Sequence, residues 1–417
     1  MLFSKIKQLQ TVSRVTQINT SLHPAKLKGK LLKAGLIATL IAAVFIAYYP
    51  YMHLSNSTLV GTDSTYYFNW LQEMHQKGPL IALEKDRPVS NLFMYSIQTL
   101  TATPTEVTIR ITPIILAACL TIAVFWFVKT GTKNEQLALM SALLTVLSFQ
   151  TTVSIYIHNL SNWLALSEAF ILFALFIKSK ENHLWKYTIL SAILGVLLLL
   201  THPYTWEVIM IILLIYSGWT IMRVTLKKID EKVEIKQLAT IVGVNMAFFA
   251  VYALLPFGRG VSYAGETTLG QLTLYFNFSN VINIQTGLEN MVQAWAGGLF
   301  GNPLLMILAL IGTFPLMKAN NTFNKLMVVW VAVPAVALLM FAPNTFLFYR
   351  ITYLIPIQIF AAAGLTLILD KLEAASGLKA NKGFQALKIL IIILVVVVLL
   401  NYALRSVDGA PLHMLEP

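Results

Sequence analysis

Long apolar runs separated by short polar segments are the dominant pattern of this chain. A transmembrane helix needs about 20 mostly apolar residues, and eleven stretches of this kind recur between residues 34 and 404. The expected spans are 34–51, 107–128, 136–157, 160–178, 184–202, 204–222, 237–257, 302–317, 324–342, 347–369 and 387–404. The pattern therefore predicts an all-α polytopic membrane protein with about eleven transmembrane helices.

The polar segments predict three regions. Residues 1–33 form a basic N-terminal segment, residues 34–404 a single transmembrane domain, and residues 405–417 an outer tail. Within the domain, two long loops are expected on the outer side, at 52–106 and 258–301. The other outer turns are short.

The charges give the chain an orientation. Of the 30 Lys and Arg residues, 23 fall in the alternate segments that include the N-terminal one and 7 fall in the others. Basic residues concentrate in cytoplasmic loops, so we expect a cytoplasmic N-terminus. This asymmetry also accounts for the net charge of +12, and no nucleic-acid partner is expected. Apolar residues make up 57% of the chain and charged residues 12%. An integral multi-pass protein of the plasma membrane, or an equivalent membrane, is therefore predicted.

The first outer loop contains helical patterns of its own. Apolar and aromatic residues recur at helical spacing in 64–77, and a second helix is expected from Pro88. The apolar sides comprise Tyr66, Tyr67, Trp70, Leu71 and Met74 in the first helix, and Leu92, Phe93, Ile97 and Leu100 in the second. Both helices are predicted to lie flat at the membrane surface, each preceded by an aspartate.

Those aspartates, Asp63 and Asp86, are the candidate catalytic residues. Asp63 could take a proton from a hydroxyl, or it could simply cap the helix that follows it. Asp86 could be a second active-site carboxylate, or it could pair on the surface with Lys85 or Arg87. The sequence leaves open which acid would be the base.

Substrate-binding candidates surround these acids at the expected membrane boundary. Tyr66, Tyr67 and Arg87 lie in the first outer loop, and Arg350 lies in a late outer turn. A guanidinium group matches a phosphate with two parallel hydrogen bonds, although Arg350 could instead be an interfacial arginine that reaches toward water. This setting suggests chemistry on a lipid-linked substrate.

Three further polar residues are candidates. His202 makes an outer turn with Pro203, and could belong to the rim of a substrate cavity. Glu266 lies in the second long loop, which could close over a substrate or be disordered. Glu168 lies inside an expected span, where an acid is by default a functional candidate.

Several chemistries have no signal in the chain. No P-loop, dinucleotide-binding or GxSxG motif occurs, and no His pair has metal-ligand spacing. We therefore predict no cofactor and no metal site; a divalent metal is possible but not indicated.

Three segments together resemble the GT-C class of polyprenyl-phosphate-dependent membrane glycosyltransferases, which includes protein O-mannosyltransferases and aminoarabinose transferases. An Asp follows the first span in GTDSTYYF (61–68), and an Arg-Pro pair opens a helix at Arg87. A late arginine, Arg350, precedes an apolar segment that contains Pro356.

The resemblance implies an inverting hexosyl- or pentosyltransferase that uses a polyprenyl- or dolichyl-phosphate sugar on the extracytoplasmic face. It implies that Asp63 is the catalytic carboxylate and that Arg350 contacts the lipid phosphate. Two departures matter. Ser64 follows Asp63 where several members have a second acid, and no Trp-Trp-Asp acceptor motif occurs, which disfavours the oligosaccharyltransferase branch.

The predicted function is transfer of a sugar from the lipid phosphate to a hydroxyl of a protein, lipid or glycan. The alternative is a membrane protein that transports lipid-linked glycans as a flippase, or a non-catalytic assembly subunit. The sequence does not specify the sugar, the acceptor or the oligomeric state.

Overall fold

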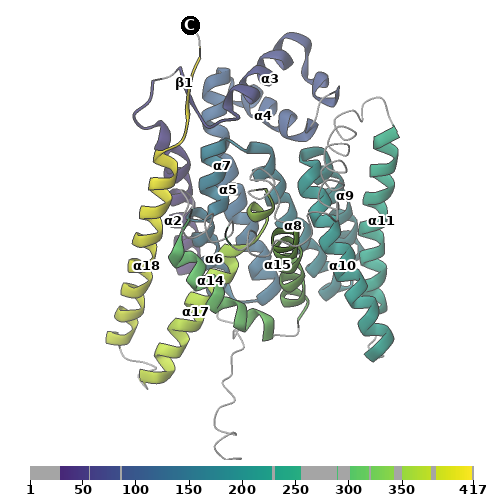
Figure 1. Ribbon diagram of the computed structural model, residues 1–417, viewed down its shortest axis with the longest axis vertical. Helices are drawn as coiled ribbons and strands as arrows, with labels where there is room; N and C mark the ends of the chain where they lie inside the picture. Colours follow the sequence, from purple (N-terminus) through teal and green to yellow (C-terminus); the bar gives the residue numbers. More distant parts are fainter. Residues whose placement is uncertain are drawn as a thin grey trace, which may run out of the picture.

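The computed structural model describes residues 29–55, 57–84, 87–227, 231–254, 289, 301–318, 321–341, 350–376 and 382–415. These residues form a bundle of long helices with two shorter helices, α3 and α4, at one end (Figure 1). The elements before Asn134 are α2 (Gly29–Tyr48), η1 (Tyr49–Tyr51), β1 (Thr58–Val60), α3 (Ser64–Lys77), η2 (Pro79–Glu84), α4 (Pro88–Thr101) and α5 (Thr105–Thr132). Those after it are α6 (Glu135–Val146), α7 (Phe149–Ile157), α8 (Leu160–Asn182), α9 (Trp185–Thr201), α10 (Pro203–Lys227), α11 (Lys232–Leu254), α14 (Pro303–Lys318), α15 (Thr322–Phe341), α17 (Ile357–Ser376), α18 (Lys382–Asp408) and β2 (Leu412–Met414).

The helices confirm the prediction of an all-α polytopic membrane protein. Within the part of the chain that the structure describes, 7 helical segments are long and apolar enough to cross a membrane. Three shorter apolar helices accompany them: α9, α14 and the first part of α15. Each of the eleven predicted ranges overlaps a described helix, although 136–157 is divided into α6 and α7. Residues 1–28 of the predicted basic segment lie outside the described residues, as does the second long loop apart from Glu289 and Gly301.

Aromatic and small residues hold the centre of the bundle together. Trp330 of α15 is fully buried and packs against Phe170 and Phe173 of α8 with tilted rings, whose centroids lie 4.8 and 4.7 Å from that of Trp330. Helices α14 and α17 approach each other through Gly312 and Gly364. A Cβ atom added at either glycine would lie within 2 Å of a backbone oxygen of the other helix. The two backbones therefore pack without intervening side chains, as small residues permit in membranes.

The first outer loop contains the two predicted helices, because α3 spans Ser64–Lys77 and α4 begins at Pro88. The polar side of α4 is more buried than the end of its apolar side. Asn91 and Gln98 are buried, whereas Leu100 is 86% exposed. The polar side of α4 faces protein because Gln98 donates a hydrogen bond to Thr105 at the start of α5. An apolar side chain that faces outward is expected where the surroundings are lipid.

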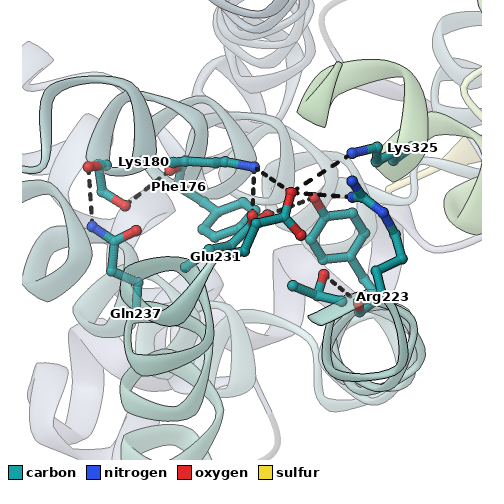
Figure 2. A network of polar contacts seen from close by, with 10 residues as sticks. Phe176, Lys180, Arg223, Glu231, Gln237 and Lys325 are labelled. Carbon is teal, nitrogen blue, oxygen red and sulfur yellow. Dashed lines mark hydrogen bonds and ion pairs between the residues drawn. The ribbon is translucent and has the colours of Figure 1, made fainter. Parts of the chain in front are cut away.

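A polar network joins four helices near the end of α8 that lies away from α3, and Figure 2 shows its contacts. Glu231 forms ion pairs with Arg223 of α10 at 3.2 Å, with Lys180 of α8 at 3.9 Å and with Lys325 of α15 at 4.0 Å. Glu234 of α11 pairs with Lys180 and accepts a hydrogen bond from Tyr216 at 2.7 Å. These contacts fix the mutual positions of α8, α10, α11 and α15.

We expect Glu234→Gln to lower the stability of the detergent-solubilised protein. The Glu234 side chain is 2% exposed and that of Lys180 25%, so a loss of roughly 2–3 kcal/mol is expected, below the range for a fully buried pair. A thermal melt checks this. Glu181→Gln is the matched control, because the pair that Glu181 forms with Lys133 is exposed. Equal melting temperatures for the two variants would contradict a bracing role for the network.

Candidate functional site

Asp63 lies immediately before α3, at a junction of three elements. Its backbone N–H donates to the carbonyl of Ile157 at the end of α7, at 2.8 Å, and its carbonyl accepts from Tyr67. Asp63 occupies the N-cap position, but its side chain makes no capping hydrogen bond. Helix capping therefore describes where Asp63 lies in the chain, but it gives the Asp63 carboxylate no hydrogen-bonding role.

The Asp63 carboxylate is partly buried and lies within electrostatic range of two arginines. Burial raises the pKa of Asp63 above its ordinary value; the positive charges of Arg87 and Arg350, and a hydrogen bond from Thr62, oppose that rise. A raised pKa makes the carboxylate a stronger base. Arg87 and Arg350 are far apart in the sequence, so only the fold brings both within electrostatic range of this acid.

Arg87 binds the start of α8 and has an unusual backbone conformation. Its Nη1 donates to the hydroxyl of Ser161 at 3.2 Å, and its guanidinium carbon lies 6.0 Å from the centre of the Tyr66 ring. Tyr67 donates to the same Ser161 hydroxyl at 3.1 Å. Arg87 has a left-handed backbone with φ of 59°, a conformation that costs a non-glycine residue about 1–2 kcal/mol. Such strain is typical of functional sites.

Arg350 precedes α17, and its guanidinium carbon lies 5.9 Å from the centre of the Tyr204 ring. Burial, followed by the positive charge of Arg87, lowers the pKa of Arg350 to about 10; Tyr204, Asp63 and Tyr67 have the opposite effect. The group remains a cation at neutral pH. The repulsion between the two guanidinium groups would be relieved by an added anion.

His202 lies within electrostatic range of Arg87 and Arg350. It is 2% exposed, and its Nδ1 shares a hydrogen bond of 2.9 Å with the Thr205 hydroxyl. Burial lowers the pKa of His202 well below its ordinary value, and the positive charges of Arg87 and Arg350 lower it further. His202 is therefore neutral at pH 7 and can serve as a hydrogen-bond partner but not as a cation.

The structure thus brings together Asp63, Arg87, Arg350, His202, Tyr66 and Tyr67. Asp86 and Glu266 lie outside the described residues. Glu168 is 8% exposed and accepts a hydrogen bond from Thr201 at 2.9 Å. Sequence reasoning assigned no binding role to Ser161. A serine on an apolar helix carries no signal that an arginine from another loop will bind it.

Metal-ligand groupings are absent from the part of the chain that the structure describes. There, no three His, Cys, Asp or Glu side chains lie together in a way that could hold a metal ion.

Gly61 sets the path of the chain into Asp63. Its φ is 98°, and a Cβ atom at this position would lie 2.5 Å from Cβ of His158. His158 is itself buried in a left-handed backbone conformation with φ of 63°. The segment before Asp63 therefore packs directly on the turn between α7 and α8, which also supplies the carbonyl of Ile157.

Comparison with known proteins places this fold. No protein-family model and no curated protein sequence matches the chain. Solved structures do match. The apo oligosaccharyltransferase of Archaeoglobus fulgidus aligns with 92% of this chain at 14% identity and a TM-score of 0.64, and its complex with Zn and sulfate aligns with 90% at 13% identity and 0.58. The chain spans 57% and 53% of the lengths of those two chains.

A second kind of transferase matches as well. ArnT from Cupriavidus metallidurans bound to undecaprenyl phosphate aligns with 91% of this chain and 75% of its own length, at 12% identity and a TM-score of 0.55. This chain therefore has the fold of GT-C membrane glycosyltransferases, as the three sequence segments suggested. At these identities the likeness concerns the fold alone.

We expect the stability of the protein to fall as pH rises through the titration of Asp63. Because the folded pKa is raised, the folded state binds this proton more tightly than the unfolded state does. The resulting stabilisation is complete below the ordinary pKa and is lost as pH rises through the folded pKa. Melting temperatures of the wild type and Asp63→Asn between pH 3.5 and 7, at about half-unit steps, measure the effect. The variant should gain stability relative to the wild type as pH rises, and parallel curves would contradict the raised pKa.

Proposed function

We propose that this protein is a glycosyltransferase that moves a sugar from a polyprenyl-phosphate donor to an acceptor hydroxyl at the outer membrane face. The observation that carries the proposal is that one partly buried carboxylate lies within electrostatic range of two arginines that come from distant segments. The shared fold of the GT-C transferases supports it. So does the undecaprenyl phosphate bound to ArnT, which is a lipid of the proposed donor class.

Asp63 is assigned as the general base. The acceptor oxygen attacks the anomeric carbon while its proton passes to the Asp63 carboxylate. The bond between the anomeric carbon and the phosphate oxygen breaks, and the electron pair leaves with the lipid phosphate. Attack from the face opposite the phosphate inverts the configuration at that carbon. A carboxylate with a raised pKa holds a proton better than an exposed aspartate does.

Arg350 and Arg87 are assigned to the phosphate. The departing group gains negative charge as the bond breaks, and guanidinium donors in a site shielded from water stabilise that charge strongly. The mutual repulsion of the two arginines supports this assignment, because a phosphate between them would relieve it. Ser161 and Tyr66 hold Arg87 in position. His202, neutral at pH 7, is suited to accept or donate a hydrogen bond to a sugar hydroxyl.

We expect Asp63→Asn to abolish transfer while the protein remains folded, because the amide cannot accept the hydroxyl proton. Removing a general base typically costs about 10²- to 10⁴-fold in rate. The assay follows radiolabelled sugar from a polyprenyl phosphate into mixed acceptors. Glu73→Gln is the control, since Glu73 also belongs to the first outer loop but pairs with the exposed Lys77. Near-normal turnover in Asp63→Asn would exclude Asp63 as the base. Vectorial movement of the lipid without transfer would favour the flippase alternative.

We expect Arg350→Ala to weaken donor use, with a donor KM raised by roughly tenfold or more, because a charge-assisted contact to the phosphate contributes about 1.5–3 kcal/mol. Arg350→Lys should recover part of this loss, since it keeps the charge but not the planar fork. Arg405→Ala provides the comparison, because Arg405 is also an arginine expected on the outer side of the membrane, and its side chain is exposed. Donor kinetics that are identical for Arg350→Ala and Arg405→Ala would disprove the phosphate assignment.

A further inference from the structure

We propose that strand β2 positions the Asp63 carboxylate, so that residues 411–415 belong to the catalytic apparatus although none of them needs to touch substrate. The inference rests on the proposed function of Asp63. It starts from the antiparallel pairing of β2 with β1, the strand that leads directly into Asp63. The register pairs Thr58 with Met414, Leu59 with His413 and Val60 with Leu412.

Hydrogen bonds bracket this short ladder on both sides. Gly61 N–H donates to the carbonyl of Pro411 at 2.8 Å, and Leu415 N–H donates to the carbonyl of Ser57 at 3.1 Å. In an antiparallel pair, hydrogen-bonded and non-hydrogen-bonded residue pairs alternate. His413 therefore faces Leu59 as a hydrogen-bonded pair, whereas the N–H groups of Leu412 and Met414 point away from β1. The hydrogen bond nearest the site ends two residues before Asp63.

The other edge of β1 is held by a side chain. Arg110 of α5 donates to the carbonyls of Ser55 and Thr58, the latter at 2.6 Å, and its guanidinium carbon lies 5.2 Å from the centre of the Tyr51 ring. The carbonyl of Ile157 then receives the N–H of Asp63 and the hydroxyl of Thr62. The backbone that leads to Asp63 thus has α5 and α7 on one side and β2 on the other.

The exposure of the two strands differs in a way that defines what β2 contributes. Thr58, Leu59 and Val60 are all buried, whereas Leu412 is 56% and Met414 82% exposed. β2 therefore supplies backbone hydrogen bonds more than apolar packing. Its anchor is Ala410, which belongs to a small buried cluster with Tyr51 and Val60. A two-stranded sheet is marginal by itself, so the pairing depends on this anchor and on α18.

Helix α18 brings β2 to the site along the outside of the bundle. Only 11% of the most apolar stretch of α18 is buried in the bundle. Figure 1 shows α18 at the edge of the bundle, with β2 beside β1 at the end that carries α3. Loss of the β2 hydrogen bonds would leave the core intact but would allow β1 and Asp63 to shift. A shift of about 1 Å in a reacting group can lower the rate by about 100-fold.

The test replaces single residues of β2 in the full-length protein. His413→Pro removes the N–H that faces Leu59, and Met414→Pro, the matched control, removes one that points away from β1. His413→Ala keeps the N–H and isolates the contribution of the imidazole. We expect His413→Pro to lower kcat at least about tenfold, with the donor KM unchanged within error and faster amide hydrogen exchange at Gly61. Met414→Pro and His413→Ala should resemble the wild type.

The outcomes separate this inference from the proposed function. Absence of transfer by the wild type would overturn the proposed function, and with it a catalytic role for β2. Faster exchange at Gly61 with unchanged kcat would overturn only the positioning role, as would equal effects of the two proline variants or a change confined to the donor KM. Should His413→Pro fail to fold, the same comparison is made between Leu415→Pro, which removes the hydrogen bond to Ser57, and Leu415→Ala, which keeps it.

Discussion

The electrostatic balance at Asp63 is the constraint on which the rest of the site depends. A carboxylate removed from water is strongly destabilised unless opposite charges and hydrogen bonds accompany it. Arg87 and Arg350 supply the charges, and the backbone around Asp63 is fixed by α7 and β1. Burial lowers the pKa of Arg350, and the positive charge of Arg87 lowers it further. Each arginine attracts Asp63 but repels the other arginine, so the cluster is suited to receive an anion as a fourth member.

The helical scaffold holds the members of this cluster at fixed separations. Helix α8 begins beside the site, where Ser161 binds Arg87, and it ends in the polar network, where Lys180 binds Glu234. With a helical rise of 1.5 Å per residue, the 23 residues of α8 span about 35 Å. Helix α17, which follows Arg350, packs backbone to backbone on α14 through Gly364. A rigid connection therefore runs from the charged cluster to the opposite end of the bundle.

The fold by itself does not select a reaction within the class. The two oligosaccharyltransferase structures give higher TM-scores than ArnT does, although the sequence has no Trp-Trp-Asp motif. One scaffold can host different acceptors because specificity comes from individual side chains and loops. In the proposed function the reacting groups are held by Asp63, Arg87 and Arg350, and the strand pair β1–β2 leads into the first of these residues.

The sequence by itself determined the membrane class, the helices and the first-loop elements. Apolar runs and Pro88 predicted α3 and α4 because helix length and helix boundaries depend on local chemistry. The sequence did not show which groups α4 meets in the fold, where Gln98 binds Thr105 and Leu100 is exposed. The meeting of Asp63 with Arg350, the contact of Arg87 with Ser161 and the pairing of β1 with β2 were decided only by tertiary structure. These contacts join residues 74 to 356 positions apart, and no local pattern records which distant groups a folded chain will bring together.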